Sequence, residues 1–289
     1  MAIDIKFVGK KYPTITYEIG REKVREFCKA IKVDDSLFTE IAPPTFPVVY
    51  TQDFLSDVLF DEEIKPNLNK LVHGEQQFLY HKPSKVGDTI TSNGYIEKIF
   101  SKGSHDFLVY RINSENQNGE LVCESVWTLI VRGGNDKDFT LKEKLMMKLA
   151  SLAPSPSSRS QPKDLPTEIE DTANGKRVKI YIDKYRPQRY AGASGDFNAI
   201  HLDNDLGKSA GLGSYILHGM ATMGMATNLF MHDKKPEEIK RYRVRFSAPV
   251  KPHDTLTYEG AFTDDKTYKF TAKNQNGADV LGACIVEFN

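Results

Sequence analysis

The sequence predicts an α+β protein made of two tandem units, each a helix packed on an antiparallel sheet. Two observations carry this prediction. The chain contains an internal repeat, because Tyr80–Gly94 resembles Phe246–Gly260 and the motif N-Q-N-G stands at both Asn116–Gly119 and Asn274–Gly277. A Pro/Ser-rich stretch, Ala153–Pro166, separates the two copies and has the composition of a linker.

The first unit opens with a helical pattern. Within residues 13–31, four apolar side chains follow helical spacing: Val24, Phe27, Cys28 and Ile31. The segment Ala42–Pro47 reads A-P-P-T-F-P and should break regular structure, and between 52 and 71 apolar and acidic residues mix. Beyond residue 71, alternation and an Asn-Gly turn indicate strands at 75–81, 89–100, 106–114 and 121–131. A helix-like segment at 141–152 precedes the linker.

The second unit repeats this order. A strand is expected at Arg177–Ile182, and the run Met220–Met231 is apolar nearly all round, which is typical of a buried helix. Four further strands are expected at 241–246, 255–262, 267–273 and 280–288. The predicted division is therefore a first unit at 1–152, a linker at 153–166 and a second unit at 167–289.

Composition excludes several classes of protein. Lys+Arg and Asp+Glu number 39 each, so the charge balance gives no reason to expect nucleic acid or an anionic membrane as a partner. The three cysteines, Cys28, Cys123 and Cys284, lie far apart and read as reduced, buried thiols without zinc spacing. The sequence has no apolar run long enough to span a bilayer and no recognisable signal peptide, so we expect a cytoplasmic protein without a metal site.

The second unit alone carries a pattern of catalytic residues. Asp196 and His201 stand five positions apart in a Gly/Asn-rich turn that also contains Asn198. His218 and Gly219 then open the apolar helix, where a backbone N–H at a helix start can stabilise a developing oxyanion. An acid, a base and such a donor are the groups needed for chemistry next to a carbonyl.

These motifs resemble those of a known family. A-S-G-D-F-N-A-I-H followed by I-L-H-G-M-A resembles the signature of the MaoC-like, or type 2 (R)-specific, enoyl-thioester hydratases and dehydratases. Those proteins have the hotdog fold, a long helix wrapped by an antiparallel sheet. The first unit is similar to the non-catalytic partner domain of the family, so the resemblance implies a fused double hotdog. Ala199 stands where the family usually has Pro, which alters the rigidity of the turn more than its chemistry.

The resemblance implies roles for the catalytic residues. In hydration, His201 would act as base on the water that attacks C3, while Asp196 delivers a proton to C2. A carboxyl group acting as an acid near neutral pH needs a raised pKa and a dry environment. Asn198 either fixes the turn or holds the same water, and Gly219 supplies the oxyanion donor. An acyl-thioesterase and a non-catalytic acyl-thioester-binding subunit are the alternatives on the same fold.

The two units differ in ways that predict one active site. Leu71–Gly74 resembles Ile216–Gly219, so the first unit keeps a His-Gly pair, but it has no counterpart of the Asp196-to-His201 loop. Its apolar helix is also expected to be missing. The space left by that helix should take a long or bulky acyl chain.

The carrier of the thioester is left open by the sequence. Arg241, Arg243 and Arg245 share one face of a strand, which is typical of a solvated surface. The alternative is that Arg243 and Arg245, with Lys251, contact the phosphates of coenzyme A or the acidic surface of an acyl carrier protein. No other cofactor is expected, and a homodimer is left open.

Overall fold

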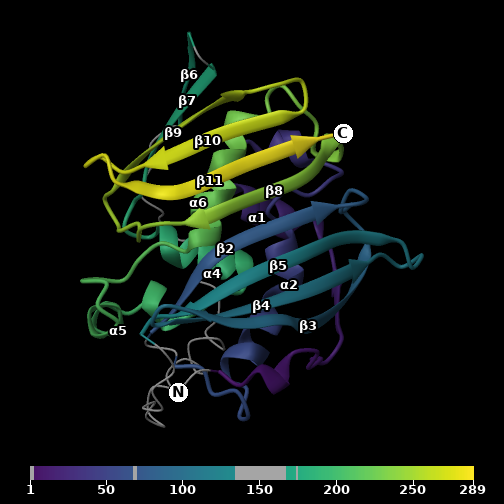
Figure 1. Cartoon of the computed structure of the whole chain (residues 1–289). Helices are drawn as coiled ribbons and strands as arrows, with labels where there is room; N and C mark the ends of the chain where they lie inside the picture. The colour runs from purple at the N-terminus through teal and green to yellow at the C-terminus, as the bar shows by residue number, and fades with distance from the viewer. Residues whose placement is uncertain (1–2, 68–69, 134–166, 174) are drawn as a thin grey trace.

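The computed structural model describes residues 3–67, 70–133, 167–173 and 175–289. Within these ranges one antiparallel sheet of 11 strands runs through both halves of the chain (Figure 1), in the order β1-β3-β4-β5-β2-β8-β11-β10-β9-β7-β6. The main helices lie together behind one face of this sheet. The predicted linker at 153–166 and the helix-like segment at 141–152 lie outside the described residues.

Each half supplies about half of the sheet. The first half contains β1 (Ile15–Glu18), α1 (Arg21–Ala30), α2 (Pro47–Leu59), β2 (Leu71–Tyr80), β3 (Thr89–Lys102), β4 (His105–Glu115) and β5 (Leu121–Val131), with the 3-10 turns η1 (Ile5–Phe7) and η2 (Asp35–Phe38). The second half contains β6 (Glu168–Thr172), β7 (Gly175–Tyr181), α4 (Arg186–Ser194), α5 (Asn204–Ser209), α6 (Gly219–Met225), β8 (Ile239–Phe246), β9 (Thr255–Phe262), β10 (Thr267–Lys273) and β11 (Asp279–Phe288). Its 3-10 turns are η3 (Ala199–His201), η4 (Ala226–Leu229) and η5 (Pro236–Glu238).

The strand order is the same on both sides of the centre. β2 and β8 pair antiparallel there, with Phe78 opposite Tyr242, and outward from each the order β5-β4-β3-β1 matches β11-β10-β9-β7. The N-Q-N-G turns also share one geometry, because the side chains of Asn116 and Asn274 each accept two backbone N–H groups of their own turn. The fold is therefore two copies of one unit joined into a single sheet, as the repeat predicts.

One prediction about the first unit is confirmed only in part, and another is wrong. The helical pattern at 13–31 forms a helix only from Arg21, because Ile15–Glu18 extends as β1 and pairs with β3. The apolar helix thought to be missing is present as α2, which starts with Pro47 in its first turn. Pro47 lacks the backbone N–H that a first-turn residue does not need, so the proline-rich segment ends at a helix start.

The match of Leu71–Gly74 to Ile216–Gly219 is also wrong. His73 and Gly74 lie inside β2, whereas His218 and Gly219 begin α6. The counterpart of α6 in the first unit is therefore α2. Because this helix fills the place that was expected to be empty, the reason given for a long acyl chain no longer holds.

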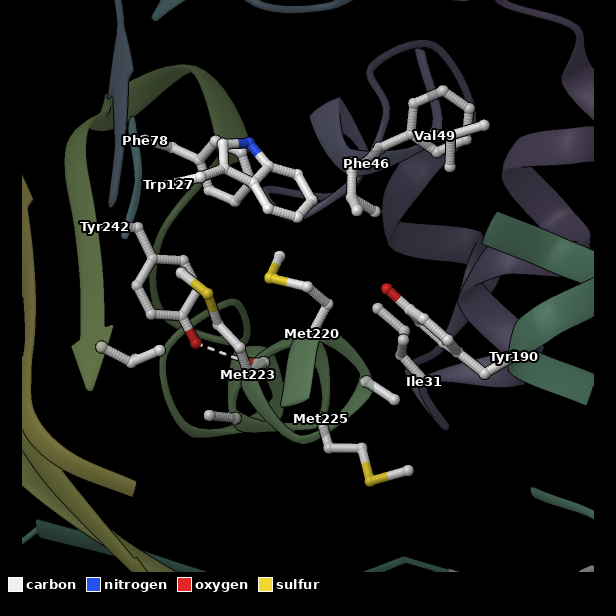
Figure 2. Packing of buried hydrophobic residues seen from close by; sticks show 14 of the residues in the cluster. Ile31, Phe46, Val49, Phe78, Trp127, Tyr190, Met220, Met223, Met225 and Tyr242 are labelled. Atoms are coloured by element: carbon white, nitrogen blue, oxygen red, sulfur yellow. Dashed lines mark hydrogen bonds between the residues drawn. The ribbon is translucent and has the colours of Figure 1, made fainter. Parts of the chain in front are cut away.

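The buried core lies between the sheet and the helices. In α6, Met220 points toward Trp127 and Met223 lies beside Tyr242, whereas Met225 points away from both rings (Figure 2). The Tyr242 hydroxyl donates to the carbonyl of Met223 at 2.6 Å. The run Met220–Met231 is buried as predicted, although its regular helix ends at Met225 and continues as the 3-10 turn η4.

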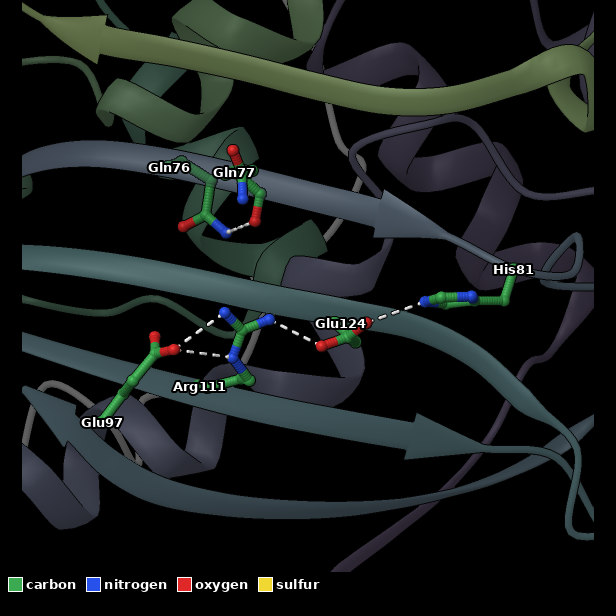
Figure 3. Close-up of polar contacts among 6 residues, drawn as sticks. All are labelled: Gln76, Gln77, His81, Glu97, Arg111 and Glu124. Carbon is green, nitrogen blue, oxygen red and sulfur yellow. Dashed lines mark hydrogen bonds and ion pairs between the residues drawn. The ribbon is translucent and has the colours of Figure 1, made fainter. Parts of the chain in front are cut away.

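The opposite face of the sheet carries ion pairs. Arg111 lies between Glu97 and Glu124, at 2.9 and 2.6 Å, and His81 contacts the second oxygen of Glu124 (Figure 3). The same alternation along β5 that exposes Glu124 buries Trp127. Free thiols are found at Cys28, Cys123 and Cys284, where burial raises the pKa of each to about 12. In the described part of the chain, every helix is too short or too polar to cross a bilayer.

A buried arginine connects the helices of the two halves. Arg186 at the start of α4 is fully buried and donates to the carbonyl oxygens of Lys29 and Ala30 at 2.9 and 3.2 Å, at the end of α1. The same guanidinium pairs with Asp183 at 3.0 Å. We predict that Arg186→Met lowers the free energy of unfolding by about 3 kcal/mol, because two carbonyls lose a buried cationic donor. Urea unfolding measures this change.

A matched control isolates the effect of burial. Arg25→Met removes an exposed pair with Glu22 on α1 and should cost at most about 0.5 kcal/mol. Equal losses of unfolding free energy in Arg186→Met and Arg25→Met would contradict the stabilising role of the buried arginine.

Candidate active site

A cavity of about 290 Å³ lies between the two halves of the molecule. Its walls are mainly apolar, and Leu55 and Leu59 of α2 contribute from the first half. The polar side chains of the second half gather on one part of the wall: Asp196, Asn198, His201, His218 and Thr222. Such a mixture, an apolar pocket with a few convergent polar groups, is typical of a binding site for a small organic group.

The loop after α4 positions Asp196. Gly195 ends α4 with a φ of 83°, a left-handed conformation that side chains other than glycine rarely adopt. The hydroxyl of Ser194 accepts the N–H of Asp196 at 3.2 Å, and the Asp196 carboxylate accepts the N–H of Asn198 at 3.1 Å. The S-G-D-F-N stretch therefore forms a closed turn that presents the Asp196 carboxylate to the cavity.

Asn198 takes the first of its two predicted roles. Its side-chain oxygen accepts the N–H of Ile200 at 3.3 Å and so caps the 3-10 turn η3 that carries His201. Asn198 also lines the cavity. Asn198 thus fixes the spacing between Asp196 and His201. The order of these residues in the sequence had already indicated that spacing.

His201 is held with one nitrogen available for chemistry. Its Nδ1 lies 2.9 Å from the carbonyl oxygen of Ile216. Because a carbonyl only accepts, Nδ1 carries the hydrogen, which leaves the lone pair on Nε2. Burial lowers the pKa of His201, although the charge of Asp196 and the bond to Ile216 act in the opposite direction. The ring is therefore a neutral base at neutral pH.

His218 supports this arrangement from behind. Its ring stacks on that of His201, with centroids 3.7 Å apart, and its Nε2 donates to the backbone carbonyl of Asp196 at 2.9 Å. Burial, with a smaller effect of the neighbouring His201, keeps the pKa of His218 well below its usual value. His218 is thus a neutral ring that contacts both His201 and the backbone of Asp196.

Gly219 begins α6 at the cavity wall. A Cβ atom at this position would lie 2.9 Å from the Phe246 ring, so glycine permits the close approach of that ring. As the first residue of the helix, its N–H has no acceptor one turn earlier within α6. The predicted oxyanion donor is thus on the same wall as Asp196 and His201.

Of the residues predicted to bind the carrier, Arg243 and Arg245 lie together on β8, apart from Lys251. Arg243 makes two bonds to the carboxylate of Glu75, at 2.8 and 2.7 Å, and Arg245 lies 4.0 Å from the same group. Both lie on the face of β8 opposite Phe246, which lines the cavity. The backbone of Lys251 follows Val250 of the cavity wall.

Two cavity residues from the first half were missed. Arg132, at the end of β5, and His73, in β2, both line the cavity. Gly74 is the extra residue of a β-bulge, since His73 pairs with Leu129 and Glu75 with Thr128. The imidazole of His73 stacks on Trp127 with centroids 4.8 Å apart, and burial lowers its pKa to about 4. The His-Gly pair inside a strand was the signal that could have indicated this bulge.

A second, smaller cavity marks the equivalent place in the first unit. It measures about 50 Å³ and lies between the end of β2 and the start of α2. The larger cavity lies at the corresponding position in the second unit, between the end of β8 and the start of α6. The wall of the smaller cavity contains prolines 43, 44, 47 and 83 but no aspartate. His81 and Glu237 also line it, but in the described residues this smaller cavity has no counterpart of the loop that joins Asp196 to His201.

Three side chains of the site have the atoms needed to bind a metal ion. Asp196, His201 and His218 offer ligand atoms within 4.8 Å of one another. His218, however, uses Nε2 on the carbonyl of Asp196, and its Nδ1 is buried without a hydrogen-bond partner. Each histidine therefore donates one ring N–H to a backbone carbonyl and keeps a lone pair on its other nitrogen, an arrangement that suits proton transfer and that metal-ligating histidines also use.

Comparisons with known proteins identify what each half of the chain is similar to. The family described as "FAS1-like, dehydratase domain region" matches residues 6–125, and the "MaoC like domain" matches residues 166–282. A UPF0336 protein of Saccharopolyspora erythraea is 34% identical over 146 residues, which cover 46% of this chain and 94% of that protein. A Dictyostelium discoideum protein named "Probable enoyl-CoA hydratase 2" is 24% identical over 312 residues, covering 99% of this chain and 98% of that one.

Solved structures share the fold. A MaoC-like dehydratase from Phytophthora capsici has a TM-score of 0.75 at 21% identity and covers 100% of this chain and 98% of its own. A Mycobacterium tuberculosis protein described as a double hotdog has a TM-score of 0.59 at 13% identity, covering 97% and 95%. The chain is therefore a double hotdog protein with a cavity between its two halves.

The matches to both halves identify the family. The chain belongs to the MaoC-like hydratases and dehydratases, with a FAS1-like dehydratase region in its first half and a MaoC-like domain in its second.

Proposed function

We propose that this protein catalyses the reversible hydration of trans-2-enoyl thioesters to (R)-3-hydroxyacyl thioesters. The observation that carries the proposal is the convergence of Asp196, His201 and the start of α6 on one cavity wall. The name of the Dictyostelium discoideum relative, which spans the whole chain, supports the same reaction.

The mechanism follows from the available atoms. Nε2 of His201 takes a proton from a water molecule, whose oxygen forms a bond to C3 of the enoyl group. The electron pair of the double bond moves toward the thioester carbonyl, and the backbone N–H of Gly219 stabilises the negative charge on that oxygen. The carboxylic acid of Asp196 then delivers its proton to C2. Dehydration follows the same steps in reverse.

The surroundings fit these roles. The hydrogen bond from Nδ1 to the Ile216 carbonyl stabilises the imidazolium that forms when His201 accepts the proton. The turn bonds of Asp196 and Asn198 keep the carboxyl group at a fixed distance from the base. The mechanism needs no cofactor beyond the carrier of the thioester.

A thioesterase is the alternative to be tested. Water would then attack the carbonyl carbon and release a free thiol, instead of adding to C3. Incubation with a crotonyl thioester distinguishes the two reactions. Loss of the enoyl absorbance without thiol release, and (R)-3-hydroxybutyryl thioester as product, supports hydration, whereas stoichiometric thiol release would refute it.

We predict an acid limb in the pH profile that reports His201. Because burial lowers the pKa of this residue from 6.5, the neutral base persists to lower pH than in an exposed histidine. The kcat/KM for hydration should therefore fall only below pH 6.5, as His201 becomes protonated in the free enzyme. Initial rates from pH 4.5 to 8, together with the ring proton shifts of His201 by NMR, check this expectation; a midpoint at about 7 or above contradicts it.

A further inference from the structure

The wall of the cavity includes exposed residues from both halves of the chain. Of its lining residues, only Arg132, Ser247 and Pro249 are exposed, whereas the others are buried or half-buried. Arg132 follows β5 of the first half, and the other two follow β8 of the second. The mouth of the cavity is therefore defined by these three residues.

Two cations border this mouth. The guanidinium of Arg132 donates to the carbonyl of Ala210 at 3.5 Å, and the ammonium of Lys251 lies 3.2 Å from the position of a Cβ on Gly213. Both charges thus touch the short segment 210–213, part of which lines the cavity. Arg132 and Lys251 are themselves exposed.

These cations differ from most arginines of the protein. Arg111, Arg177 and Arg243 are paired with glutamates on the sheet. Within the described residues, neither Arg132 nor Lys251 forms an ion pair, and Asp196 is the one carboxylate in the cavity wall. Among the residues that the structure describes, the mouth therefore carries positive charge without a paired carboxylate.

We propose that Arg132 and Lys251 form a phosphate-binding rim, which holds the phosphate of the thioester carrier while the acyl group reaches Asp196 and His201. This inference rests on the proposed function. An arginine offers paired N–H groups to phosphate oxygens, and a lysine adds a flexible point charge. The rim takes the role in phosphate binding that the sequence suggested for Arg243 and Arg245, whose side chains lie on the outer face of the sheet.

The rim predicts a difference between two substrates with the same acyl group. Crotonyl-coenzyme A carries phosphates, whereas crotonyl-N-acetylcysteamine ends before them. Arg132→Glu and Lys251→Glu should each raise the KM for the coenzyme A thioester about tenfold, since a charge-assisted hydrogen bond becomes a repulsion. The kcat for both substrates and the KM for the truncated one should change less than about twofold.

Control variants separate this effect from net charge. Lys269→Glu makes the same charge change on exposed β10, away from the cavity, and should leave both KM values unchanged. Arg245→Glu tests whether the arginines of β8, which the sequence predicted as carrier-binding residues, contact the phosphates instead of the rim. A rise in KM for Arg245→Glu but not for the rim variants, or an equal rise for both substrates in the rim variants, overturns the proposal.

Two further experiments follow. The first identifies which phosphate of the carrier is bound, and the second gives a result even if the protein shows no turnover. A parallel assay with crotonyl-acyl carrier protein assigns the contact to the phosphate at the end of the pantetheine arm if both carriers lose affinity, and to the nucleotide phosphates if only coenzyme A does. Calorimetric titration of coenzyme A into the wild type and the double variant needs no reaction. Equal affinity of the two proteins refutes the rim, whatever the outcome for hydration.

Discussion

Asp196→Asn should lower kcat for hydration of a crotonyl thioester by about 10³-fold, within the range usual for loss of a general acid or base. The amide cannot give up a proton to C2, but its oxygen can still accept the N–H of Asn198, so the turn should survive. Asp205→Asn, a change of the same type at a highly exposed site, should retain full activity. Stopped assays of enoyl consumption, with thermal melting of both variants, make the comparison.

His201→Ala should cause a loss of similar size, because Nε2 is the base of the same step. The two residues act on one bond-forming event, so the double variant should be little worse than either single one. Hydration at the wild-type rate in the double variant would show that the site has been misassigned. An unchanged melting temperature with lost activity would exclude unfolding as the cause.

The loop of the second unit that carries the proposed acid and base was predictable because its contacts are local. Asp196, Asn198 and His201 are connected by turns of two to three residues, and such turns follow from the order of residue types. The repeat was visible for the same reason, since Asn116 and Asn274 organise their own turns. The sequence could therefore indicate both the number of units and the position of the acid and base.

Helix α2 could not be recognised from its periodicity. Thr51 and Gln52 are as well buried as the valines around them, so the polar face of the helix is narrow and consists of Asp53, Ser56 and Asp57. With polar residues on both the buried and the exposed side, the period that normally marks a helix is weak. The proline at its start also has two meanings, because Pro47 can interrupt a chain or begin a helix.

Which of the basic residues face the cavity could not be predicted for a different reason. Alternation along β8 shows that Arg243 and Arg245 share a face, but it does not show which face looks inward. That depends on the pairing of β8 with β2 across the two halves, where Arg243 lies opposite Gln77. Arg132 and His73 reach the cavity through the same long-range pairing, which no local pattern specifies.

Gly219→Pro should lower kcat by about 10² to 10³-fold, the usual cost of losing one oxyanion donor. Gly219 is the first residue of α6, a position where proline fits the backbone and where the N–H has no helical acceptor. The substitution therefore removes the proposed donor with little effect on the helix. Its ring also adds a Cβ, which would meet Phe246 at 2.9 Å.

Gly219→Ala controls for that steric contact. It adds the same Cβ near the Phe246 ring but keeps the backbone N–H, so the ratio of the two variants isolates the donor. We expect the alanine variant to retain kcat to within about tenfold, because one aromatic ring must shift by a few tenths of an ångström. The KM values should differ less than kcat, since the charge on the thioester oxygen develops only in the transition state. Equal kcat values for alanine and proline would show that the oxyanion is stabilised elsewhere in the cavity.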